Sequence, residues 1–227
     1  MEQQDDALSV YRLFQLISPS LPIGGFTYSQ GLEWAVEAGW VTNRQSMQDW
    51  LGNMLFNSVA TLELPVIDKF CHALHNDDRT ALIEYSQLLY SSRETKELRA
   101  EESQRGLALA TLLKQLGIDH ASFDEPEIEM NQLLGLCIAA KYWQISPQAL
   151  KQGYLWSWAE NLVMAGVKLV PLGQTDGQRA LLSISESFPQ ALNLAGQTEA
   201  WMIGSFTPSI SIASSLHETQ YTRLFRS

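Results

Sequence analysis

Apolar residues recur every three or four positions along most of this chain, and that period constrains the fold more than any other feature. A clear run is Met47, Trp50, Leu51, Met54, Leu55 and Val59. Such a stripe lies along one face of an α-helix and is buried against neighbouring helices. Paired strand patterns, an Asn-Gly hairpin signal and internal repeats do not accompany it. The sequence therefore predicts an all-α, single-domain helical bundle over residues 1–227, with about nine or ten helices.

Prolines and glycines mark a loop near the N-terminus. Pro19 and Pro22 end a first helix over residues 7–17, because proline disfavours helical backbone in the residue before it. The following segment, residues 18–28, has the sequence SPSLPIGGFTY and is a loop by composition.

Further boundaries follow from capping residues. Asn43 is expected to cap the helix that carries the apolar stripe, and Pro65 to begin a new helix, since proline suits the first helical turn. A long helix is expected over residues 93–117, where Gly117 suits the C-terminal end. Residues 147–169 are apolar nearly all round, which predicts a central, buried helix.

The charge excludes some classes of partner. The formal net charge is −10, and the basic residues do not cluster, so binding to nucleic acid or to an anionic membrane surface is disfavoured. Residues 1–10 are acidic and lack the apolar core of a secretory signal. The most apolar stretch is interrupted by Glu160, Lys168 and Pro171, which argues against a membrane span. We therefore expect a cytoplasmic protein.

Motifs of enzymes and of metal sites are missing from the sequence. There is no phosphate loop, nucleophile elbow, HExxH or paired CxxC, so we expect neither enzymatic activity nor a cofactor. Cys71 and Cys137 lie in apolar helical patterns and are interpreted as buried free thiols in a reducing compartment. Cys71 with His72 and His75 is the best metal candidate, but a half-buried helix end is favoured, because no fourth ligand is evident.

Two charged features allow more than one interpretation. The run RETKELRAEESQR, residues 93–105, favours a solvated helix face with ion pairs at three and four residues rather than carboxylates doing acid–base work. Lys168 instead lies inside an apolar helical run. Its stem could cover the core with the ammonium group in water, or the cation could meet a partner carboxylate.

Four segments together resemble the UreF family of urease accessory proteins. They are SPSLPIGGFTYSQGLE (18–33), SRETKELRAEESQRG (92–106), LWSWAENLVMAGVKLVPLGQTDGQR (155–179) and HETQYTRLFRS (217–227). They are spread from near the N-terminus to the last residue, so the resemblance covers essentially the whole chain.

The resemblance implies an all-α, dimeric protein without enzymatic activity of its own that acts in nickel insertion into urease. One implied partner, UreD (also called UreH), contacts apo-urease. The other, UreG, is a GTPase that carries nickel. The family member recruits the GTPase and couples GTP hydrolysis to nickel delivery.

Loop 18–28 is the first expected docking segment. Its prolines stiffen it, which lowers the entropy lost on binding. Phe26 and Tyr28 suit the role of aromatic anchors, unless they fold back into the core. Ser29, which could also cap the next helix, completes this group of partner-binding candidates.

Glu33 and Lys168 match charged positions in the family's motifs and are candidates for contact with the GTPase. The alternative is a structural pair between the two side chains. We expect Glu33→Ala or Lys168→Ala to weaken the GTPase contact and to spare the fold.

The tail, residues 205–227, is the second expected docking segment. Tyr221 and Phe225 alternate with arginines in a stretch too polar to form its own core, which predicts folding on the UreD/UreH side. Arg223 matches the arginine of the family's terminal motif and could make a forked contact to a carboxylate. A frayed terminus is the alternative.

Arginines of the charged segment raise the question of GTPase activation. Arg93, Arg99 and Arg105 could in principle supply a cation in trans to the transferred phosphoryl group. Positioning or gating of the GTPase is favoured over acceleration, because no arginine lies on an obvious finger loop.

Overall fold

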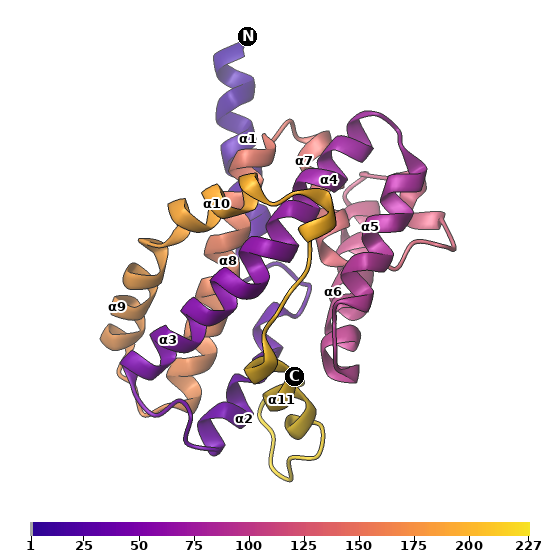
Figure 1. The fold of residues 1–227 in the computed structure, drawn as a ribbon. Helices are drawn as coiled ribbons and strands as arrows, with labels where there is room; N and C mark the ends of the chain where they lie inside the picture. The colour runs from indigo at the N-terminus through magenta and orange to yellow at the C-terminus, as the bar shows by residue number, and fades with distance from the viewer. Residues whose placement is uncertain (1) are drawn as a thin grey trace.

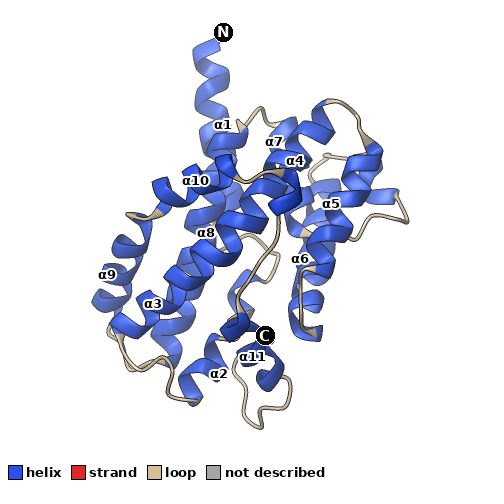
Figure 2. Cartoon of the chain, viewed as in Figure 1, coloured by secondary structure: helices blue, strands red, loops and turns tan. Residues whose placement is uncertain are grey.

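A computed structural model describes residues 2–227, and within that range the chain forms helices and loops without a strand (Figure 2). The α-helices are α1 (Glu2–Ile17), α2 (Leu32–Glu37), α3 (Arg44–Met54), α4 (Leu64–His75), α5 (Arg79–Ser91), α6 (Lys96–Gln115), α7 (Gln132–Tyr142), α8 (Pro147–Leu169), α9 (Gln174–Ser185), α10 (Phe188–Gln197) and α11 (Pro208–His217). The predicted all-α helical bundle is confirmed. No helix in the described range is both long enough and apolar enough to cross a membrane.

Helix α8 lies at the centre of the bundle, as its apolar sequence predicted. It packs against α1, α2, α4, α7 and α9, which surround it (Figure 1). Leu155, Ala159 and Leu162 are among its buried side chains. A helix with neighbours on several sides needs apolar residues around most of its circumference.

Local capping chemistry sets several helix ends. Asn43 accepts a hydrogen bond from the backbone of Ser46, whose hydroxyl accepts one from the Asn43 backbone in return. Ser146 caps α8, with Pro147 at its first position. Gly117 follows α6 with a φ of 78°, a left-handed conformation that glycine adopts without steric cost. These predicted boundaries are confirmed.

Pro65 lies in the first turn of α4, which ends at His75, so the predicted helix is confirmed. No break precedes it, however, because a π-helical segment, Leu55–Glu63, joins α3 to α4 and keeps the backbone helical through Leu64. Proline lacks the N–H that would bond to the carbonyl four residues earlier. That carbonyl, on Thr61, accepts a hydrogen bond of 3.1 Å from the backbone of Gly204 instead. A distant segment therefore supplies the bond that Pro65 cannot make.

The two chain ends lie in different places. Helix α1 projects from the body, whereas the C-terminus returns to the region of α2 and α11 (Figure 1). Helices α2 and α11 pack against each other, and α11 also contacts α6. The tail therefore ends among elements from the first half of the chain.

Candidate functional site

Parts of all four quoted segments meet around the C-terminal tail. The backbone of Arg226 donates to the carbonyl of Thr27 at 2.8 Å, which joins the tail to the first loop. The start of α6 contributes Glu97 and Glu101, and the end of α8 contributes Lys168. We call this region the tail site and define it by Ser29, Glu33, Glu97, Glu101, Lys168, His217, Arg223, Phe225 and Ser227.

Glu33 connects α2 to the tail. One carboxylate oxygen accepts the backbone N–H of Leu224 at 2.6 Å. The other accepts the N–H of Phe225 at 2.9 Å and faces Nε2 of His217 at 3.0 Å. Only 6% of Glu33 is exposed. The carboxylate therefore fixes the tail from within the protein and is not open to a partner in this conformation.

His217 is fully buried between two carboxylates. Its Nδ1 lies 2.6 Å from Oε2 of Glu97, while its Nε2 faces Glu33. Both ring nitrogens therefore face carboxylate oxygens, which accept hydrogen bonds. Oε1 of Glu97 also accepts from Nη1 of Arg223 at 2.7 Å. Sequence reasoning quoted His217 only as part of the terminal motif and missed its role.

The last residue is held by the first loop. The backbone N–H and hydroxyl of Ser29 both donate to the carbonyl of Ser227, at 2.8 and 2.5 Å. The hydroxyl of Ser227 donates to Glu101 at 2.9 Å. Ser29 is not the N-cap of α2, because Gly31 occupies that position with a φ of 81°. The oxygen of Ser29 nevertheless accepts the N–H of Glu33 at 3.2 Å.

The predicted partner-binding residues divide into exposed and buried groups. Phe26 is 58% exposed, and the exposed group also contains Lys168, Tyr221 and Arg223. The buried group contains Tyr28, Ser29, Glu33 and Phe225.

The structure bears on three sequence-based expectations: Tyr28 as an exposed anchor, a tail that is disordered alone, and a pair between Glu33 and Lys168. Tyr28 folds inward, and its hydroxyl donates to Gln104 at 2.8 Å, so only Phe26 is available as an aromatic anchor of the loop. The tail is ordered, with α11 and Phe225 packed on the body, and is not frayed. Glu33 pairs with His217, while the ammonium of Lys168 lies 5.8 Å from the centre of the Phe225 ring.

The charged run of 93–105 is only partly a solvated face, because several of its ion pairs are buried, although the predicted pairing at four residues occurs between Glu101 and Arg105. Arg93 lies 2.7 Å from Glu63 and 2.8 Å from Glu102, and all three side chains are largely buried. Burial opposes the positive charge, but the two carboxylates outweigh it and raise the pKa of Arg93. Arg105 pairs with buried Glu101 at 2.8 Å. Sequence alone gave no sign of Glu63, which lies on the π-helical segment.

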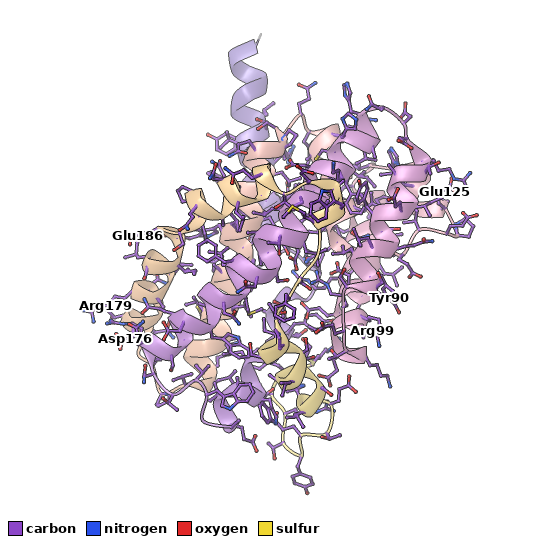
Figure 3. The ribbon with its side chains drawn as sticks, in the orientation of Figure 1. Tyr90, Arg99, Glu125, Asp176, Arg179 and Glu186 are labelled. Carbon is purple, nitrogen blue, oxygen red and sulfur yellow. The ribbon has the colours of Figure 1, made fainter. Side chains whose placement is uncertain are left out.

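This burial leaves fewer arginines that could supply a cation in trans to the transferred phosphoryl group. Arg93 and Arg105 are occupied inside the bundle. Arg99 lies at the outer edge of α6, and its Nη1 donates to the carbonyl of Arg93 at 2.6 Å (Figure 3). Arg93 and Arg105 are therefore not free to contact another protein.

A surface groove of about 430 Å³ runs beside the tail site. Its basic side chains are Lys96, Arg223 and Arg226, and its acidic ones are Glu97 and Glu218. Glu97 is already engaged with His217 and Arg223. On a chain with a net charge of −10, this groove therefore presents a local group of cations.

The candidate metal residues lie elsewhere. Cys71, His72 and His75 border a separate cavity that Cys137 also lines. Among the side chains that the structure describes, residues 8–227, no three His, Cys, Asp or Glu come together in a way that could hold a metal ion.

Comparisons with known proteins agree on one family. The model of the UreF family matches residues 41–185. The urease accessory protein UreF of Alcanivorax borkumensis is 50% identical over 224 residues, covering 96% of this chain and 97% of the relative. That of Pseudomonas putida strain W619 is 46% identical over 220 residues, with 97% and 98% covered. That of Alkalilimnicola ehrlichii is 44% identical over 227 residues, with 99% of each chain covered.

Proposed function

This chain belongs to the UreF family of urease accessory proteins and has a role in urease maturation, and from that premise we propose that it acts as a non-enzymatic adaptor. It bridges the complex of UreD/UreH with apo-urease to the GTPase UreG, and it couples GTP hydrolysis to nickel delivery. One observation carries the proposal: the four segments that resemble the family gather at the tail site, next to a groove with basic side chains.

The exposed residues around the tail site are suited to direct contact. Phe26 and Tyr221 offer aromatic surface, which often dominates the free energy of binding at interfaces. Lys168 and Arg223 offer cations. A guanidinium group can bind a partner carboxylate through two parallel hydrogen bonds.

The buried residues support that surface indirectly. Tyr28, Ser29, Glu33 and Phe225 fix the backbone of loop 18–28 and of the tail, residues 205–227. A surface held in one conformation loses less entropy on binding. We therefore keep all four in the proposed docking apparatus, as positioning residues.

Coupling to GTP hydrolysis is proposed to work by positioning or gating. Arg93 and Arg105 are bound to buried carboxylates, and withdrawing either would leave those charges unpaired. A homodimer in the cytoplasm is the proposed setting.

Pull-down with purified UreD and UreG tests the adaptor. We expect wild-type protein to retain both partners. Phe26→Ala and Tyr221→Ala should weaken retention while leaving the circular dichroism spectrum unchanged, because both side chains are exposed. Leu182→Ala is a matched control, since Leu182 is an exposed apolar residue of α9, outside the tail site.

Failure of the folded wild-type protein to bind either partner would overturn the proposal. The GTPase rate of UreG measured with and without this protein separates gating from acceleration. Size-exclusion chromatography with light scattering tests the homodimer.

A further inference from the structure

The two cysteines of the chain meet at one cavity, although 66 positions (137 − 71) separate them in the sequence. Cys71 lies on α4 and Cys137 on α7, and these helices pack side by side (Figure 1). Both thiols line a cavity of about 510 Å³ that shares no residue with the tail site. The cavity therefore gives small molecules access to the partly buried Cys71, with Cys137 behind it.

The two thiols have different surroundings. Cys137 is 1% exposed, and its thiol donates a hydrogen bond to the carbonyl of Ile67 at 3.7 Å. The neighbouring Cys137 lowers the pKa of Cys71, whereas burial raises the pKa of Cys137. Cys71 is only partly buried. The more accessible sulfur is therefore also the one that more readily becomes a thiolate.

Charged side chains around the cavity also shift the pKa values of the two thiols. The neighbouring Cys137 thiol lowers the pKa of Cys71, against burial and the carboxylate of Asp68, while the ammonium of Lys151 adds to the lowering. Lys151 and Asp68 form an ion pair at 2.7 Å. Burial raises the pKa of Cys137. His72, His75 and Lys141 are the other ionisable side chains that face the cavity.

We propose that Cys71 and Cys137 form a dithiol site that reacts with small disulfides of the glutathione class. The Cys71 thiolate attacks one sulfur of the small disulfide, forms a mixed disulfide and releases one small thiolate. Cys137 then loses its proton and attacks the Cys71 sulfur, forming the Cys71–Cys137 bond and releasing the second small thiolate. Two electrons pass from the protein dithiol to the small disulfide, and two small thiols result.

The assignment of roles follows from reactivity. A thiolate is the nucleophile in exchange, so the accessible Cys71 begins the reaction. Cys137 is too buried to meet the small disulfide first, but it lines the same cavity as Cys71, on the helix packed against α4. In a reducing compartment the dithiol form persists, and a rise in small disulfides links α4 to α7. This site is independent of the proposed adaptor function.

The test exposes the reduced, folded chain to oxidised glutathione and follows its intact mass. Wild-type protein should lose two hydrogens, and non-reducing peptide mapping should find Cys71 joined to Cys137. Cys137→Ala should stop at a stable glutathione adduct on Cys71. Cys71→Ala should remain unmodified. Circular dichroism before the reaction establishes that each variant is folded, and Cys137→Ser replaces Cys137→Ala if the latter is not.

Charge variants test whether the site sets the rate. Asp68→Asn should speed adduct formation in the Cys137→Ala background several-fold, because it removes a carboxylate that opposes the Cys71 thiolate. Asp176→Asn is the control, since Asp176 lies on α9, away from this cavity, and should leave the rate unchanged (Figure 3). A folded wild-type protein that keeps both thiols free would overturn the proposal. So would adducts that form equally on Cys71 and Cys137 in the two single variants.

Discussion

At the scale of single residues, Glu33 shows how a charged side chain can serve an interface from inside the protein. Its oxygens accept from the Leu224 and Phe225 amides and face the His217 ring. A buried hydrogen-bond donor that loses its acceptor carries the full cost of its desolvation. The carboxylate therefore determines whether the end of the tail keeps its backbone path.

Glu33→Ala should lower the free energy of unfolding by about 2–5 kcal/mol, because three donors lose their acceptor and the charge facing His217 disappears. Urea denaturation monitored by circular dichroism measures the loss. Lys168→Ala, at the same site, should cost about 1 kcal/mol or less, since it removes one cation–π contact near the surface. Equal stability of Glu33→Ala and wild type would contradict this. This prediction replaces the sequence-based expectation that Glu33→Ala spares the fold, because Glu33 is buried.

Arg93→Leu should be more damaging than its surface counterpart. It leaves the carboxylates of Glu63 and Glu102 buried without their shared cation, at a cost of about 3–5 kcal/mol. Arg44→Leu breaks only the exposed pair with Asp176 and should cost about 1 kcal/mol or less. Denaturant midpoints compared at one pH decide between them. Similar losses in both variants would show that the buried network contributes little.

At the scale of helices, the sequence predicted what depends on near neighbours. Asn43, Ser146 and Gly117 act within a few residues, so their helix ends could be read directly. The path through Pro65 could not, because it depends on a bond from Gly204. The burial of Arg93 was missed for the same reason: its partner Glu63 comes from another helical segment, and charge density alone favoured solvent.

Two glycine-to-alanine changes inside helices should have opposite effects. A Cβ on Gly106 of α6 would lie 2.5 Å from the backbone nitrogen of Asn131, where α7 begins. Gly106→Ala should therefore destabilise the protein by about 1–3 kcal/mol or more. Gly52 of α3 has open space at that position, and Gly52→Ala should stabilise by about 0.5–1 kcal/mol. Thermal unfolding measures the change in melting temperature of each variant. A change in the same direction for both would contradict the proposed close approach of α6 and Asn131.

Helix α8 carries a carboxyl group whose pKa is raised by burial, on Glu160. An acid with a raised folded-state pKa binds its proton more tightly when folded. Its contribution to stability is therefore full below the unfolded pKa and is lost as the pH rises through the folded pKa. Glu160→Gln should stabilise the protein at pH 7, and the gain should shrink as the pH falls through the raised folded-state pKa and be gone below the ordinary glutamate pKa. Melting temperatures across that range test this, and a gain independent of pH would contradict it.

At the scale of the whole molecule, the C-terminal tail contacts three parts of the chain that are far apart in the sequence. Loop 18–28, the start of α6 and the end of α8 each contact the tail, through Thr27, Glu97 and Lys168. Their contacts with one another include the hydrogen bond from Tyr28 of the loop to Gln104 of α6. Order in these regions should therefore depend on the tail, even though most of the core lies outside it.

Removal of residues 218–227 should loosen the tail site and leave the bundle folded. Amide hydrogen exchange should rise in residues 27–33, where Ser29 and Glu33 lose their bonds to the tail. It should stay low in α4 and α8, whose core packing does not involve those residues. Hydrogen exchange with mass spectrometry resolves such local opening, because each segment exchanges with its own opening free energy. Tyr221→Ala is the control, since its exposed ring can be removed without loss of these bonds. Unchanged exchange in residues 27–33 after truncation would mean that the first loop holds its conformation without the tail.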